Sequence, residues 1–120
     1  KINDSIKLTK NNKKITLLVA FDYGGRQEIV RATKKLLSSG ISLEEINEKS
    51  FSKFLFTGQV PDPDLVIRTA GEFRISNFLL WQTAYSEFYS TETFWPDFNE
   101  NEIDKALLVY SKRKRKFGNV

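Results

Sequence analysis

The sequence lacks two side chains on which much protein chemistry depends: among its 120 residues there is no cysteine and no histidine. The first absence excludes disulfide bonds and thiolate nucleophiles, and the second excludes imidazole as a metal ligand or general base. Any metal ion bound here must therefore be a hard cation held by carboxylate and phosphate oxygens. No apolar run approaches the ~18 residues of a membrane-spanning helix, and no secretory signal is visible. We expect a soluble cytoplasmic protein.

Positive charge is concentrated in one short stretch. The formal net charge is +4, and residues 112–116 supply five positive charges; without them, 14 basic residues face 15 acidic ones. The basic excess is therefore local, which argues against a general nucleic-acid-binding surface. Such a run is usually a solvated helix end, and phosphate binding is the alternative interpretation.

The length allows one domain at most and is near the lower limit for a doubly wound sheet, so we expect part of a larger domain. In the polar residues 1–14, Ile2 and Ile6 have helical spacing and no capping residue precedes them. This pattern indicates a helix whose start is missing, with a disordered terminus as the alternative.

A strand, a turn and a helix follow. Residues 15–21 are almost continuously apolar, as in a strand covered on both faces. The Gly24-Gly25 turn then leads into a helix with an apolar stripe over residues 29–37, which Gly40 ends. A turn of this kind is more often simple turn chemistry than a phosphate cradle, and both interpretations stay open here.

Capping residues mark the other helices. Ser42 opens a capping box with Glu45, Ser50 is expected to cap a helix through Leu55, and Asn99 is expected to cap the last helix with Glu102 at the box position. In that last helix the apolar arc is wider than one face, because Leu108 and Val109 extend it. A dimer interface would bury such an arc.

The most informative stretch is residues 64–76. Its short run of Leu65, Val66 and Ile67 predicts a buried strand ending at Arg68, and Ser76 is placed to cap a helix over the next apolar run. Because ligands bind beyond the carboxyl ends of strands in α/β sheets, Arg68, Arg74, the Ser76 hydroxyl and the helix N–H groups would together bind a phosphate. The alternative is that Arg68 pairs with Glu72 or Asp64 and Ser76 only caps.

Glu87 lies among aromatic residues, and a buried carboxylate needs a partner. A hydrogen bond to a nearby polar group and a metal-ligand role are both open. A straight helix from Ser76 would carry Glu87 ~16 Å away. Either the chain folds back before Glu87, or Glu87 serves a neighbouring subunit.

Several of these motifs together closely resemble the cis-prenyltransferases, and in particular the bacterial undecaprenyl diphosphate synthases. The resemblance runs in order from about Ile15 to Gly118 and is most specific over residues 74–81. The matching segments are Asp22-Tyr-Gly-Gly-Arg26, Asp64-Leu-Val-Ile-Arg-Thr69, Gly71-Glu72, Arg74-Ile-Ser-Asn-Phe-Leu-Leu-Trp-Gln82, Ala84-Tyr-Ser-Glu-Phe-Tyr89 and Trp95-Pro-Asp-Phe98.

The resemblance implies a homodimer of α/β subunits, each with a mostly parallel central sheet, flanking helices and a hydrophobic tunnel. Such enzymes extend an allylic diphosphate, for example farnesyl diphosphate, with isopentenyl diphosphate to a long-chain polyprenyl diphosphate, using Mg²⁺. The lipid product implies peripheral membrane contact, and no nucleic acid is expected.

Carried over by motif, Arg68, Arg74, Ser76 and the Ile75 backbone would hold the diphosphate of isopentenyl diphosphate. Glu87 matches a carboxylate associated with Mg²⁺, and Glu72 would orient an arginine. No catalytic residue is assigned within this chain, because the chemistry needs positioning and Mg²⁺ and no protein nucleophile.

The sequence departs from the family pattern in several places. Ala70 and Asp22 stand where many members have Gly and Asn, Phe73 replaces a potential metal-binding His of some members, and residues 116–119 only partly match endings that reach the partner's active site in some relatives. The family's N-terminal half, with the Mg²⁺ aspartate and the allylic diphosphate loop, has no counterpart. We therefore expect residues 1–120 to be the C-terminal portion of one domain, inactive alone; a non-catalytic partner subunit is the alternative.

Overall fold

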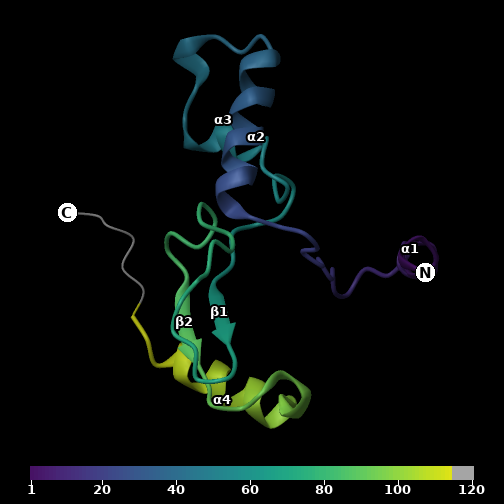
Figure 1. Cartoon of the computed structure of the whole chain (residues 1–120), viewed down its shortest axis with the longest axis vertical. Coiled ribbons are helices and arrows are strands. Elements are labelled where there is room, and N and C mark those ends of the chain that lie inside the picture. Colours follow the sequence, from purple (N-terminus) through teal and green to yellow (C-terminus); the bar gives the residue numbers. More distant parts are fainter. Residues whose placement is uncertain (115–120) are drawn as a thin grey trace.

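A computed structural model describes residues 1–114 of the chain (Figure 1). Two parallel strands form a sheet that lies between helical elements, which confirms the predicted α/β class with a parallel sheet. The helices and strands in chain order are α1 (Ile2–Thr9), α2 (Gly25–Ser38), α3 (Glu48–Ser52), β1 (Leu65–Arg68), β2 (Glu87–Ser90) and α4 (Glu100–Ser111), with short 3₁₀ turns at Leu43–Glu45 and Trp95–Asp97.

β1 is the strand expected from the short apolar run, and it ends at Arg68 as predicted. It pairs in parallel with β2, so that Leu65 lies opposite Glu87 and Arg68 opposite Ser90. The expectation of a helix starting at Ser76 is wrong. Ser76, Asn77 and Leu79 all have positive φ, which a right-handed helix cannot contain, and the connection between the strands is a series of turns.

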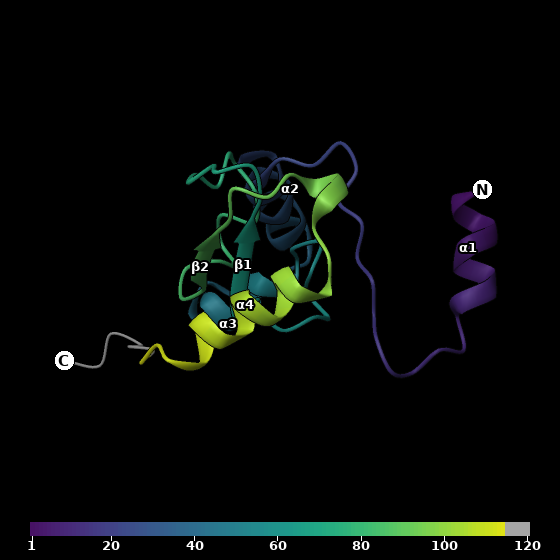
Figure 2. The same ribbon diagram turned by 90° about the horizontal axis from the view of Figure 1, so that it is seen from below.

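The predicted strand at residues 15–21 is also not formed. The segment has no sheet partner among residues 1–114, and Leu17 and Phe21 are more than four-fifths exposed. A strand needs a neighbour for its N–H and C=O groups, and no described segment provides one. In both Figure 1 and Figure 2 this segment connects α2 to a distant α1, which has no buried residue.

α2 buries a narrower face than its apolar stripe predicted. Glu28, Ala32 and Leu36 are buried, whereas Val30 and Leu37 remain exposed. The helix ends as expected, because Gly40 follows it with a φ of +75°.

The capping predictions are mostly right. The Ser42–Glu45 box is present, and the Asn99 side chain accepts a hydrogen bond from the Asn101 N–H at 3.0 Å at the start of α4. α3, however, is capped by Asn47, and Ser50 is the third residue of its capping box. Glu102 contacts Thr91 and Lys105 and does not close a box with Asn99.

The chain is extended for its length. Its radius of gyration is 17.0 Å, whereas a compact chain of this length has ~14 Å. Apolar side chains on residues 15–21 and on α4 are accordingly exposed. Within residues 1–114, no helix is long and apolar enough to cross a bilayer.

Candidate functional site

The segment after β1 is tied to the segment after β2. The N–H of Ala70 donates to the carbonyl of Thr93 at 3.0 Å, and that of Gly71 to Thr91 at 2.9 Å. Ala70 has a φ of +63° and Gly71 a φ of +67°, so the alanine that departs from the family pattern adopts left-handed geometry. The turn directs the chain back along the sheet from the carboxyl end of β1.

The two predicted arginines line one cavity. Its volume is about 290 Å³, and Arg68, Arg74 and Ile75 contribute to its wall together with Val66, Phe78 and Thr83. Glu72 forms an ion pair with Arg74, whose side chain is 63% exposed. Glu72 therefore does not pair with Arg68, which has no ion pair within the described residues. This carboxylate can orient the Arg74 guanidinium, as the motif implied.

Ser76 is placed differently from the other predicted ligands. It is exposed, has a φ of +45° and is not among the residues that line this cavity. Because no helix begins here, the helix N–H groups expected to assist in anion binding are not provided. The site brings together Arg68, Arg74 and Ile75, with Ser76 next to them in the chain.

The Gly24-Gly25 turn packs directly on this loop. The N–H of Gly25 donates to the Asn77 carbonyl at 2.7 Å, and the N–H of Arg26 donates to Asn77 Oδ1 at 2.9 Å. Since these N–H groups at the amino end of α2 already have protein acceptors, the turn serves packing. The interpretation as turn chemistry is the one that the geometry supports.

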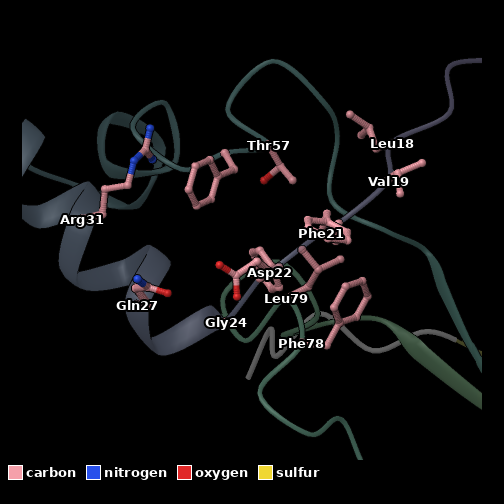
Figure 3. A pocket seen from close by; sticks show the side chains of 13 residues that line it. Leu18, Val19, Phe21, Asp22, Gly24, Gln27, Arg31, Thr57, Phe78 and Leu79 are labelled. Atoms are coloured by element: carbon pink, nitrogen blue, oxygen red, sulfur yellow. The ribbon is translucent and has the colours of Figure 1, made fainter. Parts of the chain in front are cut away.

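A larger apolar pocket adjoins the arginine cavity. Its volume is about 410 Å³, and Phe78 lines both cavities. Figure 3 shows Phe21, Phe78 and Leu79 gathered on one side and Gln27 and Arg31 from α2 on the other. A cavity lined by two arginines beside an apolar one suits an amphiphilic ligand with a charged head and a hydrocarbon tail.

A buried carboxylate that the sequence analysis missed supports this pocket. Glu28 is 1% exposed; it accepts hydrogen bonds from the Tyr23 hydroxyl, from the Phe56 N–H at 2.6 Å and from Gln82 Nε2 at 3.1 Å. Burial and the Glu28 carboxylate raise the pKa of Tyr23. The sequence offered one signal for Glu28, namely that an acidic residue falls on the buried face of α2 next to apolar residues.

Residues 1–118 match the prenyltransferase family model described as "Putative undecaprenyl diphosphate synthase". The chain belongs to this family.

Curated prenyltransferases match the chain over nearly its whole length. The isoprenyl transferase of Fusobacterium nucleatum is 60% identical over 112 residues, which are 93% of this chain and 47% of that protein. The ditrans,polycis-undecaprenyl-diphosphate synthase ((2E,6E)-farnesyl-diphosphate specific) of Legionella pneumophila is 50% identical, with 98% of this chain and 51% of that protein covered. The chain thus spans about half the length of the curated relatives it matches.

Solved structures of prenyltransferases share the fold. Lavandulyl diphosphate synthase from Lavandula x intermedia, in complex with dimethylallyl diphosphate, is 39% identical with a TM-score of 0.91, covering 98% of this chain and 52% of that chain. A probable undecaprenyl diphosphate synthase from Campylobacter jejuni is 33% identical with a TM-score of 0.83, covering 98% and 56%. The arrangement of this chain therefore recurs within prenyltransferase chains about twice as long.

Glu87 lies apart from the arginine cavity of this prenyltransferase chain. It begins β2 at the Leu65 end of the sheet, and three residues of strand put it ~10 Å from the level of Arg68. Its carboxylate accepts a hydrogen bond from Arg113 Nη1 at 2.7 Å. Among residues 1–114 there is no group of three acidic side chains that would hold a metal ion. The described residues do not by themselves fit an Mg²⁺ site.

Proposed function

We propose that this chain carries the isopentenyl-diphosphate-binding side of a cis-prenyltransferase, which condenses that substrate with an allylic diphosphate to a long-chain polyprenyl diphosphate. The observation that carries the proposal is that Arg68 and Arg74 line one cavity whose Phe78 wall also lines the larger apolar pocket. The arginines would bind the diphosphate, and the apolar side chains would surround hydrocarbon.

The contribution of these residues to the reaction is positioning. In the condensation the C–O bond of the allylic diphosphate breaks and inorganic diphosphate leaves. The isopentenyl double bond forms the new carbon–carbon bond to the allylic carbon, and the resulting carbocation loses a proton to form the new double bond. Fixing the isopentenyl diphosphate through two guanidiniums would align its double bond with the allylic carbon, which makes the encounter effectively unimolecular. Glu72 holds Arg74 in the orientation that the diphosphate requires.

The parts of the activity that lie outside this cavity are also proposals. Mg²⁺ would bind on the allylic side, with Glu87 as one ligand and the other ligands from beyond residues 1–114. Glu87 would then give up its ion pair with Arg113 to bind the metal ion. Glu87 lies at the other end of the sheet from Arg68. A role in the site of a neighbouring subunit therefore suits Glu87 better than a role in the arginine cavity of its own subunit.

Dimerisation through α4 is proposed from its exposed apolar residues. Ile103, Leu107 and Leu108 are 44–56% exposed, as expected of a helix that a second subunit covers. Sedimentation equilibrium would report twice the chain mass of 13.9 kDa if this helix mediates a homodimer.

A cytoplasmic location with peripheral membrane contact stays a prediction, which fractionation of cells would test. Of the basic stretch, residues 115–116 lie outside the described residues, as does the partly matching end at residues 117–119.

The arginine cavity is tested by calorimetric titration of the chain with isopentenyl diphosphate. We expect Arg68→Ala and Arg74→Ala each to weaken binding about 10- to 100-fold, because a hydrogen bond to a charged group contributes ~1.5–3 kcal/mol and 1.4 kcal/mol is tenfold. Lys34→Ala removes the same charge from the exposed face of α2 and is the matched control. Equal affinity in all four proteins would rule out the proposed site.

A further inference from the structure

The amino end of α2 is capped by a residue far away in the sequence. The first N–H groups of a helix have no partner within the helix, and Gly24 at the cap position has no side chain to offer. Asn77 supplies two of the missing acceptors, its carbonyl to the Gly25 N–H and its Oδ1 to the Arg26 N–H. The loop that carries Arg74 is thereby fastened to α2 three residues after that arginine.

This contact requires glycine at position 25 and leaves little room at Gly24. A Cβ on Gly25 would lie 3.0 Å from the Asn77 carbonyl oxygen and 2.9 Å from Leu80 Cγ, and a Cβ on Gly24 would lie 3.0 Å from Asn77 Nδ2. Any side chain at Gly25 would therefore push the loop away from the helix. The Gly-Gly turn and the arginine loop, which are separate motifs in the sequence, form one packed unit.

The backbone of the loop shows that it is held by its surroundings. Ser76, Asn77 and Leu79 all have a φ between +45° and +65°, a region that residues other than glycine enter at a cost in free energy. Strained conformations of this kind persist only where neighbouring structure determines them. Among residues other than glycine, asparagine tolerates this region well, and the two bonds of Asn77 to α2 hold the turn against the helix.

From these contacts we infer that Asn77 is a positioning residue for the diphosphate site, which aims Arg74 by fixing its loop on α2. The inference rests on the proposed function, because Arg74 is assigned to the diphosphate there. Asn77 itself need not touch the ligand.

Two measurements on the full chain test this role: amide hydrogen exchange by NMR and the affinity for inorganic pyrophosphate. In Asn77→Ala we expect exchange about tenfold faster at Arg26 and at Phe78, whose N–H donates to the Ile75 carbonyl within the loop. Pyrophosphate should bind about tenfold more weakly, because a small displacement of positioned groups is costly. Gly25→Ala, which displaces the loop from the helix side, should weaken binding similarly.

The control variants separate positioning from simple loss of a helix cap. Asn99→Ala removes an equivalent cap bond at the start of α4, at a residue that does not line the cavity, and should speed exchange at Asn101 while leaving pyrophosphate affinity within about twofold of the wild type. Asn77→Asp keeps the accepting oxygen and should retain slow exchange at Arg26. Unchanged exchange at α4 amides in Asn77→Ala would show that the variant is folded.

The outcomes distinguish this inference from the function on which it rests. If the wild type binds pyrophosphate and Asn77→Ala binds it equally well, the positioning role is wrong and the proposed site stands. Unchanged exchange at Arg26 and Phe78 in Asn77→Ala would also overturn the role. If the wild type does not bind pyrophosphate while exchange at both amides rises, the contact between the loop and α2 is upheld and the proposed diphosphate site fails.

Discussion

At the scale of single residues, the backbone of the site is strained at Ala70. This residue follows Arg68 closely and has a φ of +63°, which its bond to Thr93 and the turn at Gly71 maintain. Glycine adopts this conformation without the steric cost that alanine carries. The loop therefore adopts left-handed geometry at Ala70, although alanine is less suited to this geometry than glycine.

We predict that Ala70→Gly stabilises the chain by roughly 0.5–1 kcal/mol. Left-handed geometry costs an alanine ~1–2 kcal/mol, and glycine gives back ~0.5–1 kcal/mol through its larger chain entropy when unfolded. The midpoint of urea unfolding measures the difference. Ala106→Gly, at a fully buried position in α4, is the control and should lower the midpoint. A lower midpoint for Ala70→Gly would contradict the prediction.

At the scale of elements, one buried carboxylate fastens α4 to the strand that precedes it. Glu102 accepts hydrogen bonds from Lys105 Nζ at 2.5 Å and from the Thr91 hydroxyl at 3.0 Å. These bonds, that to Lys105 first, lower the pKa of Glu102 below its ordinary value of 4.5. Because Thr91 also accepts the Gly71 N–H, the contact connects α4 to the loop after β1.

The lowered pKa predicts how this contact depends on pH. The ionised Glu102 carboxylate is more favourable in the folded chain than in the unfolded chain. Its contribution to the free energy of unfolding is therefore present above pH 4.5 and is lost as the pH falls through the folded pKa. Glu102→Gln should lower the thermal midpoint at neutral pH and flatten its decrease below pH 4.5. Glu100→Gln, on the exposed first turn of the same helix, is the control. An unchanged acid profile in Glu102→Gln would exclude this assignment.

At the scale of the whole molecule, the chain exposes surface that its fold needs to cover. Residues 15–21 have no strand partner among the described residues, and α1 lies apart from the sheet. The backbone of this chain superposes on 52% of the solved lavandulyl diphosphate synthase chain. We propose that a complementary segment, equivalent to the other half of the relatives, pairs with residues 15–21 and covers the face between α1 and the sheet.

We predict that the chain alone makes no long-chain product from farnesyl diphosphate, isopentenyl diphosphate and Mg²⁺. The arginine cavity is proposed to bind only one of the two diphosphates, and the described residues hold no acidic cluster for the metal. A radiolabelled isopentenyl diphosphate assay measures the product, with the Fusobacterium isoprenyl transferase as the positive control. Adding a polypeptide that carries the remaining half of that relative should produce activity. Long-chain product from the pure chain would disprove the prediction, and lasting inactivity of the mixture would favour the non-catalytic partner subunit.

The parts of this structure that depend on near neighbours in the sequence could be predicted. β1, the start of α4 at Asn99 and the end of α2 at Gly40 follow from local apolar runs, capping side chains and a glycine with positive φ. Arg68 and Arg74 could be placed in one site, because a strand end and the turn after it lie close together in any α/β sheet. The family, too, was evident from motifs that are short and continuous.

The sequence by itself therefore determined the class of fold, the family and the two arginines that line one cavity. Only the tertiary structure decided that Ser76 begins a turn and not a helix, because its neighbour Asn77 bonds to Arg26, 51 positions away. It also decided that Glu87 contacts Arg113 at the far end of the sheet from Arg68. The physical reason is the same in both cases: hydrogen bonds between distant segments outweigh local helix propensity, and the sequence pattern does not show which segments meet.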